Sequence, residues 1–347
     1  MDQDRYEYGQ DPMIDLMMTA EWSKAALEQG DELALARAEM RTAETLYNLA
    51  RNGMDGHVGL AAEKLDSSRA VFRRHLPEAR VDLAESHYLS ANAARGVNWP
   101  TAREHYDAAL PLLRRDSEPI LYADVCDGLA ASLVRGPGGD LPDTQERALL
   151  CYYDAFSVEP PAVPPERWAL TAHGLMLTLA ERYRGGVVDN WMAIAQIGDR
   201  ALPAALEGSN HRLQNGIYEL AARARLAVSI FGMLNGALTN TDALATVDWA
   251  AELLDALPAD PGATTHAELA GQLRWAVERA AVVGVETAVL ACIAMLARVG
   301  DRRGQIALHL QLAEHGDARA HAERAARLLH RHDAPELHQL LAEMRAT

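Results

Sequence analysis

Apolar residues recur every three or four positions along most of the chain, which is the spacing of one face of an α-helix. Between Met13 and Met344, glycine, proline and Gly-Asp pairs interrupt this pattern repeatedly, as the ends of helices do. Runs that alternate polar and β-branched residues, as strands do, are almost absent. The pattern therefore predicts an all-α chain in which short turns separate successive helices.

The interruptions divide the chain into about sixteen expected helices. They are expected at residues 13–28, 32–51, 60–75, 211–238, 241–257, 263–282, 284–299, 302–315, 317–331 and 334–346, with helical hairpins between 83 and 160 and one more after them. Asp189 is expected to cap the helix that contains Trp191, because Asp is a preferred N-cap residue.

Two successive stretches between residues 83 and 160 carry the same order of residue types. The first contains Leu89, Ser90, Gly96, Ala102, Tyr106 and Ala109, and the second contains Leu129, Ala130, Gly136, Ala148, Tyr152, Ala155 and Pro160. Each small-aromatic-small triplet lies on one helical face, where a neighbouring helix can approach closely. This order resembles the tetratricopeptide repeat (TPR) family, whose units pair two helices with small and aromatic residues at these positions. A weaker third copy follows, in which Gly174 and Leu175 repeat Gly128 and Leu129.

The resemblance implies a fold and a domain organisation. The expected fold is a right-handed α-α superhelix, a TPR-like solenoid of about eight helical hairpins. Residues 1–12 are expected to form a flexible acidic leader, 13–262 the TPR-like hairpins, and 263–347 shorter hairpins of the same solenoid.

The resemblance also implies a binding surface, because the first helix of each hairpin lines a concave groove in this family. The groove positions of this chain carry His87, Arg95, Asp124, Asp127, Arg135, His173 and Glu181. This mixed-charge lining can hydrogen-bond an extended peptide or a small polar ligand, although any one of these residues could equally belong to an ordinary solvated face. The lysine and asparagine set with which family members hold a C-terminal carboxylate is missing, since no lysine follows Lys64.

Composition and charge narrow the expected partners and location. Hydrophobic residues form 49% of the 347 residues but aromatic residues only 5%, so the core is expected to be rich in Ala and Leu. The net charge of −16 disfavours nucleic acid and anionic membranes as partners. The acidic N-terminus is unlike a secretory signal, and the most apolar span, 280–297, is interrupted by Glu286 and Thr287. A cytoplasmic protein that binds neither nucleic acid nor membrane is expected.

Candidate chemistry is sparse. Cys126, Cys151 and Cys292 show no paired spacing and are expected to be buried thiols. Six of the thirteen histidines fall in the last 40 residues, but none are spaced i, i+4, so neither a metal nor another cofactor is expected. Asp124 and Asp127 are the carboxylate pair that shares a helix face, and no phosphate-binding loop or nucleophile motif accompanies them.

Three functions remain open on this evidence. The first is a non-enzymatic adaptor or regulatory protein that binds a protein or peptide in its groove, without catalytic residues. The second is a sensor module, in which a peptide or small molecule in the groove changes the curvature of the superhelix and thereby signals to a partner. The third is an enzyme that uses His87, Asp124, Asp127 and His173, since helical folds can host chemistry without a local motif.

Overall fold

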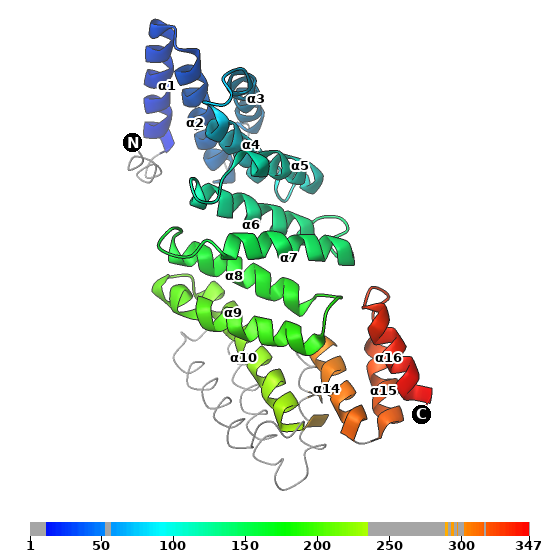
Figure 1. Cartoon of the computed structure of the whole chain (residues 1–347). Coiled ribbons are helices and arrows are strands. Elements are labelled where there is room, and N and C mark those ends of the chain that lie inside the picture. The colour runs from blue at the N-terminus through cyan, green and yellow to red at the C-terminus, as the bar shows by residue number, and fades with distance from the viewer. Residues whose placement is uncertain are drawn as a thin grey trace. The chain divides into compact units, whose positions relative to one another are not determined.

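Every regular element that the structure describes is helical. The computed structural model describes residues 12–52, 57–234, 302–315 and 317–346, with single positions at 289, 290, 293, 294 and 297. These ranges contain thirteen α-helices, one 3-10 helix and no strand (Figure 1). The all-α prediction is confirmed for this part of the chain. The leader predicted at 1–12, apart from Pro12, the helices predicted at 241–257 and 263–282, and most of the helix predicted at 284–299 lie outside the described residues.

The chain divides into two compact units, residues 1–139 and 140–347, here called the N-terminal and the C-terminal unit. The N-terminal unit contains α1 (Pro12–Gln29), α2 (Glu32–Arg51), α3 (Val58–Arg74), α4 (Arg80–Ala94), α5 (Trp99–Ala109), the 3-10 helix η1 (Leu110–Leu112) and α6 (Pro119–Arg135). The C-terminal unit contains α7 (Pro142–Phe156), α8 (Pro165–Ala180), α9 (Val187–Glu207), α10 (His211–Leu234), α14 (Arg302–His315), α15 (Ala318–Leu328) and α16 (Pro335–Ala346).

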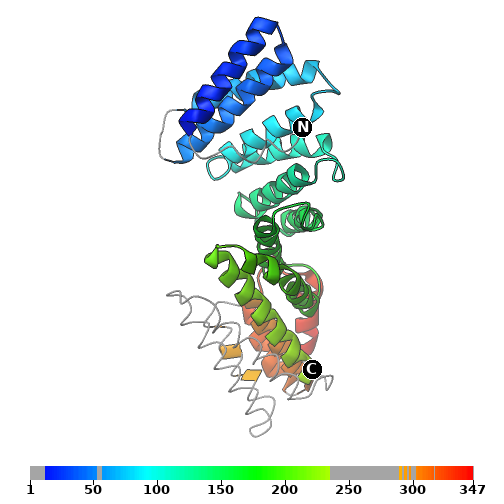
Figure 2. The same ribbon diagram turned by 90° about the vertical axis from the view of Figure 1, so that its left-hand side faces the viewer.

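Helices of the N-terminal unit pack mainly on their neighbours in the sequence. Contacts join α1 to α2, α2 to α3, α3 to α4, α4 to α5 and α5 to α6, and the antiparallel pair α1 and α2 is visible in both Figure 1 and Figure 2. Two further contacts skip one helix, because α2 touches α4 and α4 touches α6. Consecutive packing of this kind is compatible with a helical repeat.

Helix ends follow local rules that the sequence already showed. Asp31 accepts a hydrogen bond from the N–H of Ala34 at the start of α2, and Asn98 accepts one from Thr101 at the start of α5. Gly30 and Gly96 adopt φ angles of +68° and +87°, which side-chain-bearing residues rarely do, and each marks a turn. The Asp189 prediction is wrong: α9 begins at Val187 after Gly186, so Asp189 lies inside the first turn, where its negative charge still favours the helix N-terminus.

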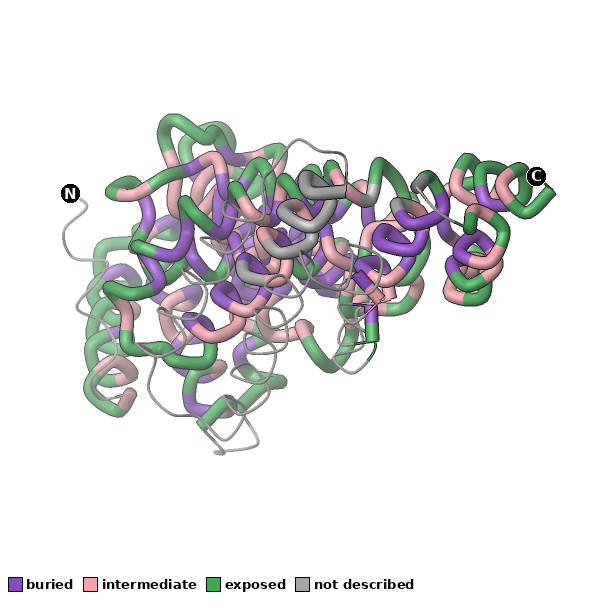
Figure 3. The backbone as a smooth tube through the Cα atoms, turned by 90° about the horizontal axis from the view of Figure 1, so that it is seen from below, coloured by how far each residue is buried: buried purple, intermediate pink, exposed green. Residues whose placement is uncertain are grey.

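Small residues of the repeats lie where helices meet, as predicted. Ala102, Ala109, Ala148 and Ala155 are each no more than 1% exposed, and buried positions recur along the helices in Figure 3. The aromatic residue between them fills the gap beside a glycine of the next helix. A Cβ added to Gly128 would lie 2.5 Å from Cε1 of Tyr106, and one added to Gly174 would lie 2.7 Å from Cε1 of Tyr152. Both contacts leave room only for glycine.

The C-terminal unit contains, in addition, a contact between helices that are far apart in the sequence. Its first helices pack consecutively, α7 on α8, α8 on α9 and α9 on α10, with α8 also touching α10. After the residues that the structure leaves undescribed, α14 contacts α9 and α10 before the chain continues into α15 and α16. The last three helices thus return to the earlier part of the unit (Figure 1).

Candidate functional site

The seven predicted groove residues are distributed over both units. His87, Arg95, Asp124, Asp127 and Arg135 belong to α4, its C-cap and α6 in the N-terminal unit, whereas His173 and Glu181 belong to α8 and its C-cap in the C-terminal unit. Because α4 contacts α6, the first five lie on neighbouring helices. Each set has surroundings of its own.

His87 is buried inside its hairpin. It is 9% exposed, and its Nδ1 lies 3.0 Å from Nδ1 of His105 on α5. One ring must donate and the other accept, so at least one of these nitrogens carries no proton. Burial lowers the pKa of His87 to about 4, and the charges of Arg69 and Arg73 on α3 act in the same direction. The structure thus places a neutral His87 against another helix.

The charges of Arg95 and Asp127 both act on the phenol of Tyr106, a residue that the sequence pattern assigned only to packing. Tyr106 is fully buried and donates a hydrogen bond of 2.5 Å to Oδ1 of Asn92. Burial raises the pKa of Tyr106, Arg95 opposes the rise by its charge and by a hydrogen bond, and the charge of Asp127 adds to it. Arg95 and Asp127 themselves are half-buried. Charges of both signs, from the C-cap of α4 and from α6, thus act on a buried phenol of α5.

Asp124 and Arg135 occupy the rest of α6. Asp124 is half-buried, and Arg135, the last residue of the helix, is exposed. Beside Arg135, the side chain of Arg103 on α5 donates to three carbonyl oxygens at the end of α6 and in the loop that follows, at 3.0–3.1 Å. This arginine satisfies carbonyl groups that a helix end leaves unpaired, so it fixes the position from which Arg135 extends.

The two groove residues of the C-terminal unit have different surroundings. His173 is half-buried, and its ring lies against Gly216 of α10, where an added Cβ would be 2.5 Å from Nε2 of the imidazole. Glu181 is exposed at the C-cap of α8, and its backbone oxygen accepts a hydrogen bond of 3.0 Å from Nε2 of Gln145. Only Glu181 of this pair presents a fully exposed side chain.

A polar junction that the sequence did not reveal fastens the last helices of the C-terminal unit. Asp333, between α15 and α16, accepts hydrogen bonds from Arg302 at 2.6 Å, from Arg303 at 2.8 Å and from the N–H of His330 at 2.6 Å. Tyr183, in the α8–α9 loop, stacks on His330 with ring centroids 5.2 Å apart and lies 5.0 Å from the guanidinium of Arg303. We call these five residues the Asp333 clasp.

The clasp is buried and electrostatically demanding. The side chains of Asp333 and Arg303 are 1% and 6% exposed. Burial raises the pKa of Asp333, but the hydrogen bonds from Arg302 and from the His330 N–H, together with the charge of Arg302, lower it by more. The pKa therefore lies below its usual value, and Asp333 stays ionised. Burial lowers the pKa of Arg303 to about 10 against the attraction of Asp333. Two arginines at the start of a helix oppose its dipole, and this was the one local hint of a distant carboxylate partner.

The remaining candidate ligands do not converge on a metal. Nδ1 of His309 on α14 lies 3.3 Å from Nδ1 of His321 on α15, so this pair repeats the arrangement of His87. Burial lowers the pKa of His309 to about 4, as do the charges of His321, Arg324 and Arg327. Within the described residues, no three His, Cys, Asp or Glu side chains are grouped as metal ligands. Cys126 and Cys151 are buried thiols, as predicted, and Cys292 lies outside the described residues.

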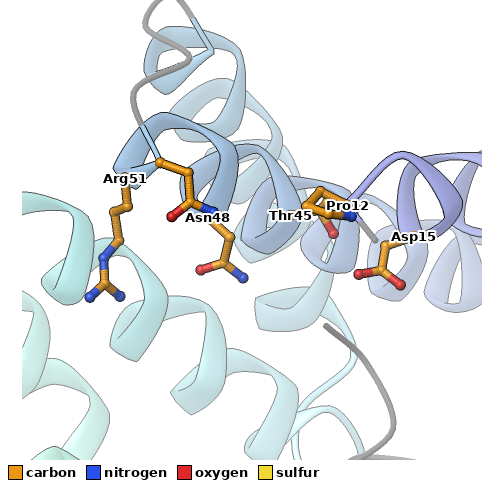
Figure 4. A pocket seen from close by; sticks show the side chains of 6 residues that line it. Pro12, Asp15, Thr45, Asn48 and Arg51 are labelled. Carbon is orange, nitrogen blue, oxygen red and sulfur yellow. The ribbon is translucent and has the colours of Figure 1, made fainter. Parts of the chain in front are cut away.

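A cavity of about 340 Å³ opens where the first turn of α1 meets the last two turns of α2 (Figure 4). It is lined by Pro12, Asp15, Thr45, Asn48, Arg51 and Asn52. In Figure 4 Asp15 and Arg51 stand at opposite ends of this lining, with Thr45 and Asn48 between them. None of these residues was among the predicted groove positions.

Comparison with known proteins gives the chain no family assignment. No family model matches it, and no curated protein sequence is significantly similar to it. Among the described helices, none combines the length and the apolar character that a membrane span requires. The function must therefore be argued from the geometry described above.

Proposed function

We propose that this protein is a helical-repeat adaptor or regulatory protein that binds a protein or peptide along its first-helix face. By first-helix face we mean the surface formed in the N-terminal unit by α2, α4 and α6, with its counterpart on α8 and α10 in the C-terminal unit. The proposal rests on consecutive helix packing together with the resemblance of residues 83–160 to TPR units.

One observation carries the proposal. Helix α4 contacts both α2 and α6, although another helix separates the members of each pair in the sequence. Equivalent positions on these helices therefore form a continuous surface, which an extended partner can follow. On α4 and α6 this surface offers Arg95, Asp127 and Arg135, which are half-buried or exposed and carry charges of both signs. Such a mixture suits the alternating polar groups of a peptide.

Other residues of the predicted lining play a supporting part. His87 is held by His105 within the hairpin, and its role in the proposal is to fix α4 against α5. The enzyme alternative needs the ring of His87 to reach the groove carboxylates, whereas that ring lies against His105 of α5, with the two Nδ1 atoms 3.0 Å apart. Binding is accordingly the function that this geometry favours.

Charge reversal on the first-helix face tests the proposal. We expect Asp127→Lys and Arg135→Glu to weaken capture of the native partner in pull-downs from the source cell extract, measured by quantitative mass spectrometry. Matched reversals on other helices, Glu104→Lys on α5 and Arg73→Glu on α3, should leave capture unchanged, because both residues are exposed on helices that do not belong to this face. Reversal at exposed Arg135 should change stability by no more than about 0.5 kcal/mol.

The control for folding is a thermal melt of each variant. If Asp127→Lys and Arg135→Glu fold normally and capture the same proteins as the wild type in the same amounts, the first-helix face is not the binding surface. The loop at 136–139, in which Pro137 is exposed, would then be the next surface to vary in the N-terminal unit.

A further inference from the structure

We infer that the cavity between α1 and α2 is a binding site for a small zwitterion, such as an amino acid or a short peptide with both ends free. Its carboxylate would pair with Arg51, its ammonium group with Asp15, and its polar middle with Asn48 and Asn52. This inference does not depend on the first-helix face, because none of the cavity residues belongs to the predicted groove set.

Arg51 and Asp15 are charges without partners in the part of the chain that the structure describes. Other arginines of α2 are engaged: Arg37 pairs with Asp82 at 2.9 Å, and Arg41 pairs with Glu85 at 2.9 Å. Arg51, ten residues after Arg41, is exposed, lines the cavity and makes no ion pair with another described residue. Two unpaired charges of opposite sign at the two ends of one cavity are what a zwitterionic ligand requires.

The neutral side chains that line the cavity can also hydrogen-bond a ligand. Asn48 and Asn52 are exposed, and each side-chain amide offers two donors and an acceptor. The helix-capping bonds of Asn52 are made by its backbone N–H, which leaves its side chain free to turn toward a ligand. Thr45 donates its hydroxyl to the backbone oxygen of Arg41 at 3.1 Å, so toward the cavity it can only accept.

The pairing of charges selects the class of ligand. Arg51 lies at the negative C-terminal end of α2 and Asp15 at the positive N-terminal end of α1, so each side chain offsets the dipole of its own helix. A simple anion would be attracted by Arg51 but repelled by Asp15, and a simple cation would meet the reverse. A molecule with both charges can pair with both side chains, and the volume of about 340 Å³ lies in the range of small-molecule sites.

Chemical blocking of one ligand end at a time tests the inference. We would titrate triglycine, N-acetyl-triglycine and triglycinamide into the full-length protein and follow binding by NMR chemical-shift perturbation. Triglycine should bind most tightly, and either block should weaken binding roughly threefold or more, as loss of one exposed ion pair implies.

Variants assign each end of the ligand. Arg51→Gln should remove the difference between triglycine and triglycinamide, and Asp15→Asn the difference between triglycine and its acetylated form. The matched controls Arg73→Gln and Asp116→Asn, exposed elsewhere on the N-terminal unit, should retain both differences. Equal affinity of the three peptides, no binding of any, or unchanged discrimination in both cavity variants would overturn the inference.

Discussion

The two units solve the problem of holding helices together in different ways. In the N-terminal unit, the helices contact neighbours one or two places along the chain. In the C-terminal unit, α14 returns to α9 and α10, and the Asp333 clasp joins residue 183 to residues 302–303 and 330–333. Nearest-neighbour stacking depends on local packing at each step, whereas a return contact makes the last three helices depend on a few buried charges.

The largest expected effect distinguishes the units directly. Asp333→Asn leaves Arg303 buried without a counter-charge, which should cost about 3–5 kcal/mol in the C-terminal unit. Hydrogen exchange followed by mass spectrometry should show loss of protection in α14, α15 and α16, with α2 to α5 unchanged. Asp189→Asn, an exposed carboxylate of the same unit, serves as the control.

A second variant separates charge from packing in the clasp. Combining Asp333→Asn with Arg303→Met removes both buried charges and should recover part of the lost stability, since an uncompensated charge is the main cost. Unchanged protection of α14–α16 in Asp333→Asn would mean that the clasp does not hold these helices.

An intermediate loss of stability is expected at the glycine–tyrosine contacts that both units contain. Gly128→Ala would press a methyl group against Tyr106 in the N-terminal unit, and Gly174→Ala against Tyr152 in the C-terminal unit. Each should lower the free energy of unfolding by about 1–3 kcal/mol through overpacking. Chemical denaturation measures both.

Gly59→Ala is the matched control for these glycines. It lies in α3, and an added Cβ meets no atom within 4 Å. It should be neutral or stabilise by up to about 1 kcal/mol through helix propensity. A loss at Gly59 as large as that at Gly128 would show that backbone conformation, and not the tyrosine ring, sets the cost.

The smallest effect concerns pH and is again shared by both units. The pKa of His87, and of His309, is about 4 in the folded protein, below the unfolded value of 6.5. A lowered pKa contributes stability that is fully present above 6.5 and is lost as pH falls toward 4. For one such histidine, the loss between pH 7 and pH 6 should be under about 1 kcal/mol.

The environment of each pair favours the neutral rings. Arg69 and His105 face His87, and His321, Arg324 and Arg327 face His309. Asp66 and Glu104 offset part of this only at His105, whose pKa is also lowered by burial. His87→Gln should flatten the pH dependence of the urea midpoint in the N-terminal unit, and exposed His211→Gln should not. A midpoint that responds to pH equally in both variants would contradict this assignment.

Within the described residues, local signals in the sequence were enough to identify the helices and many of their ends. Periodicity, the caps Asp31 and Asn98, and the glycines before α2 and α5 act within a few residues, so they can be read without knowing the fold. The burial of Ala102 and Ala155 followed from the same local spacing. Whether the helices form a superhelix stays a prediction.

Tertiary structure alone decided which polar residues are available. His87 looked like a groove residue from its position, yet His105, eighteen residues later, holds it inside the hairpin. No sequence pattern links Tyr183 with Arg303 and Asp333. Their contact depends on how α14 packs against α9 and α10 and brings the last helices back to the α8–α9 loop. The cavity at Asp15 and Arg51 likewise forms only when α1 lies antiparallel to α2. Local rules fix the helices, but long-range packing determines which side chains meet.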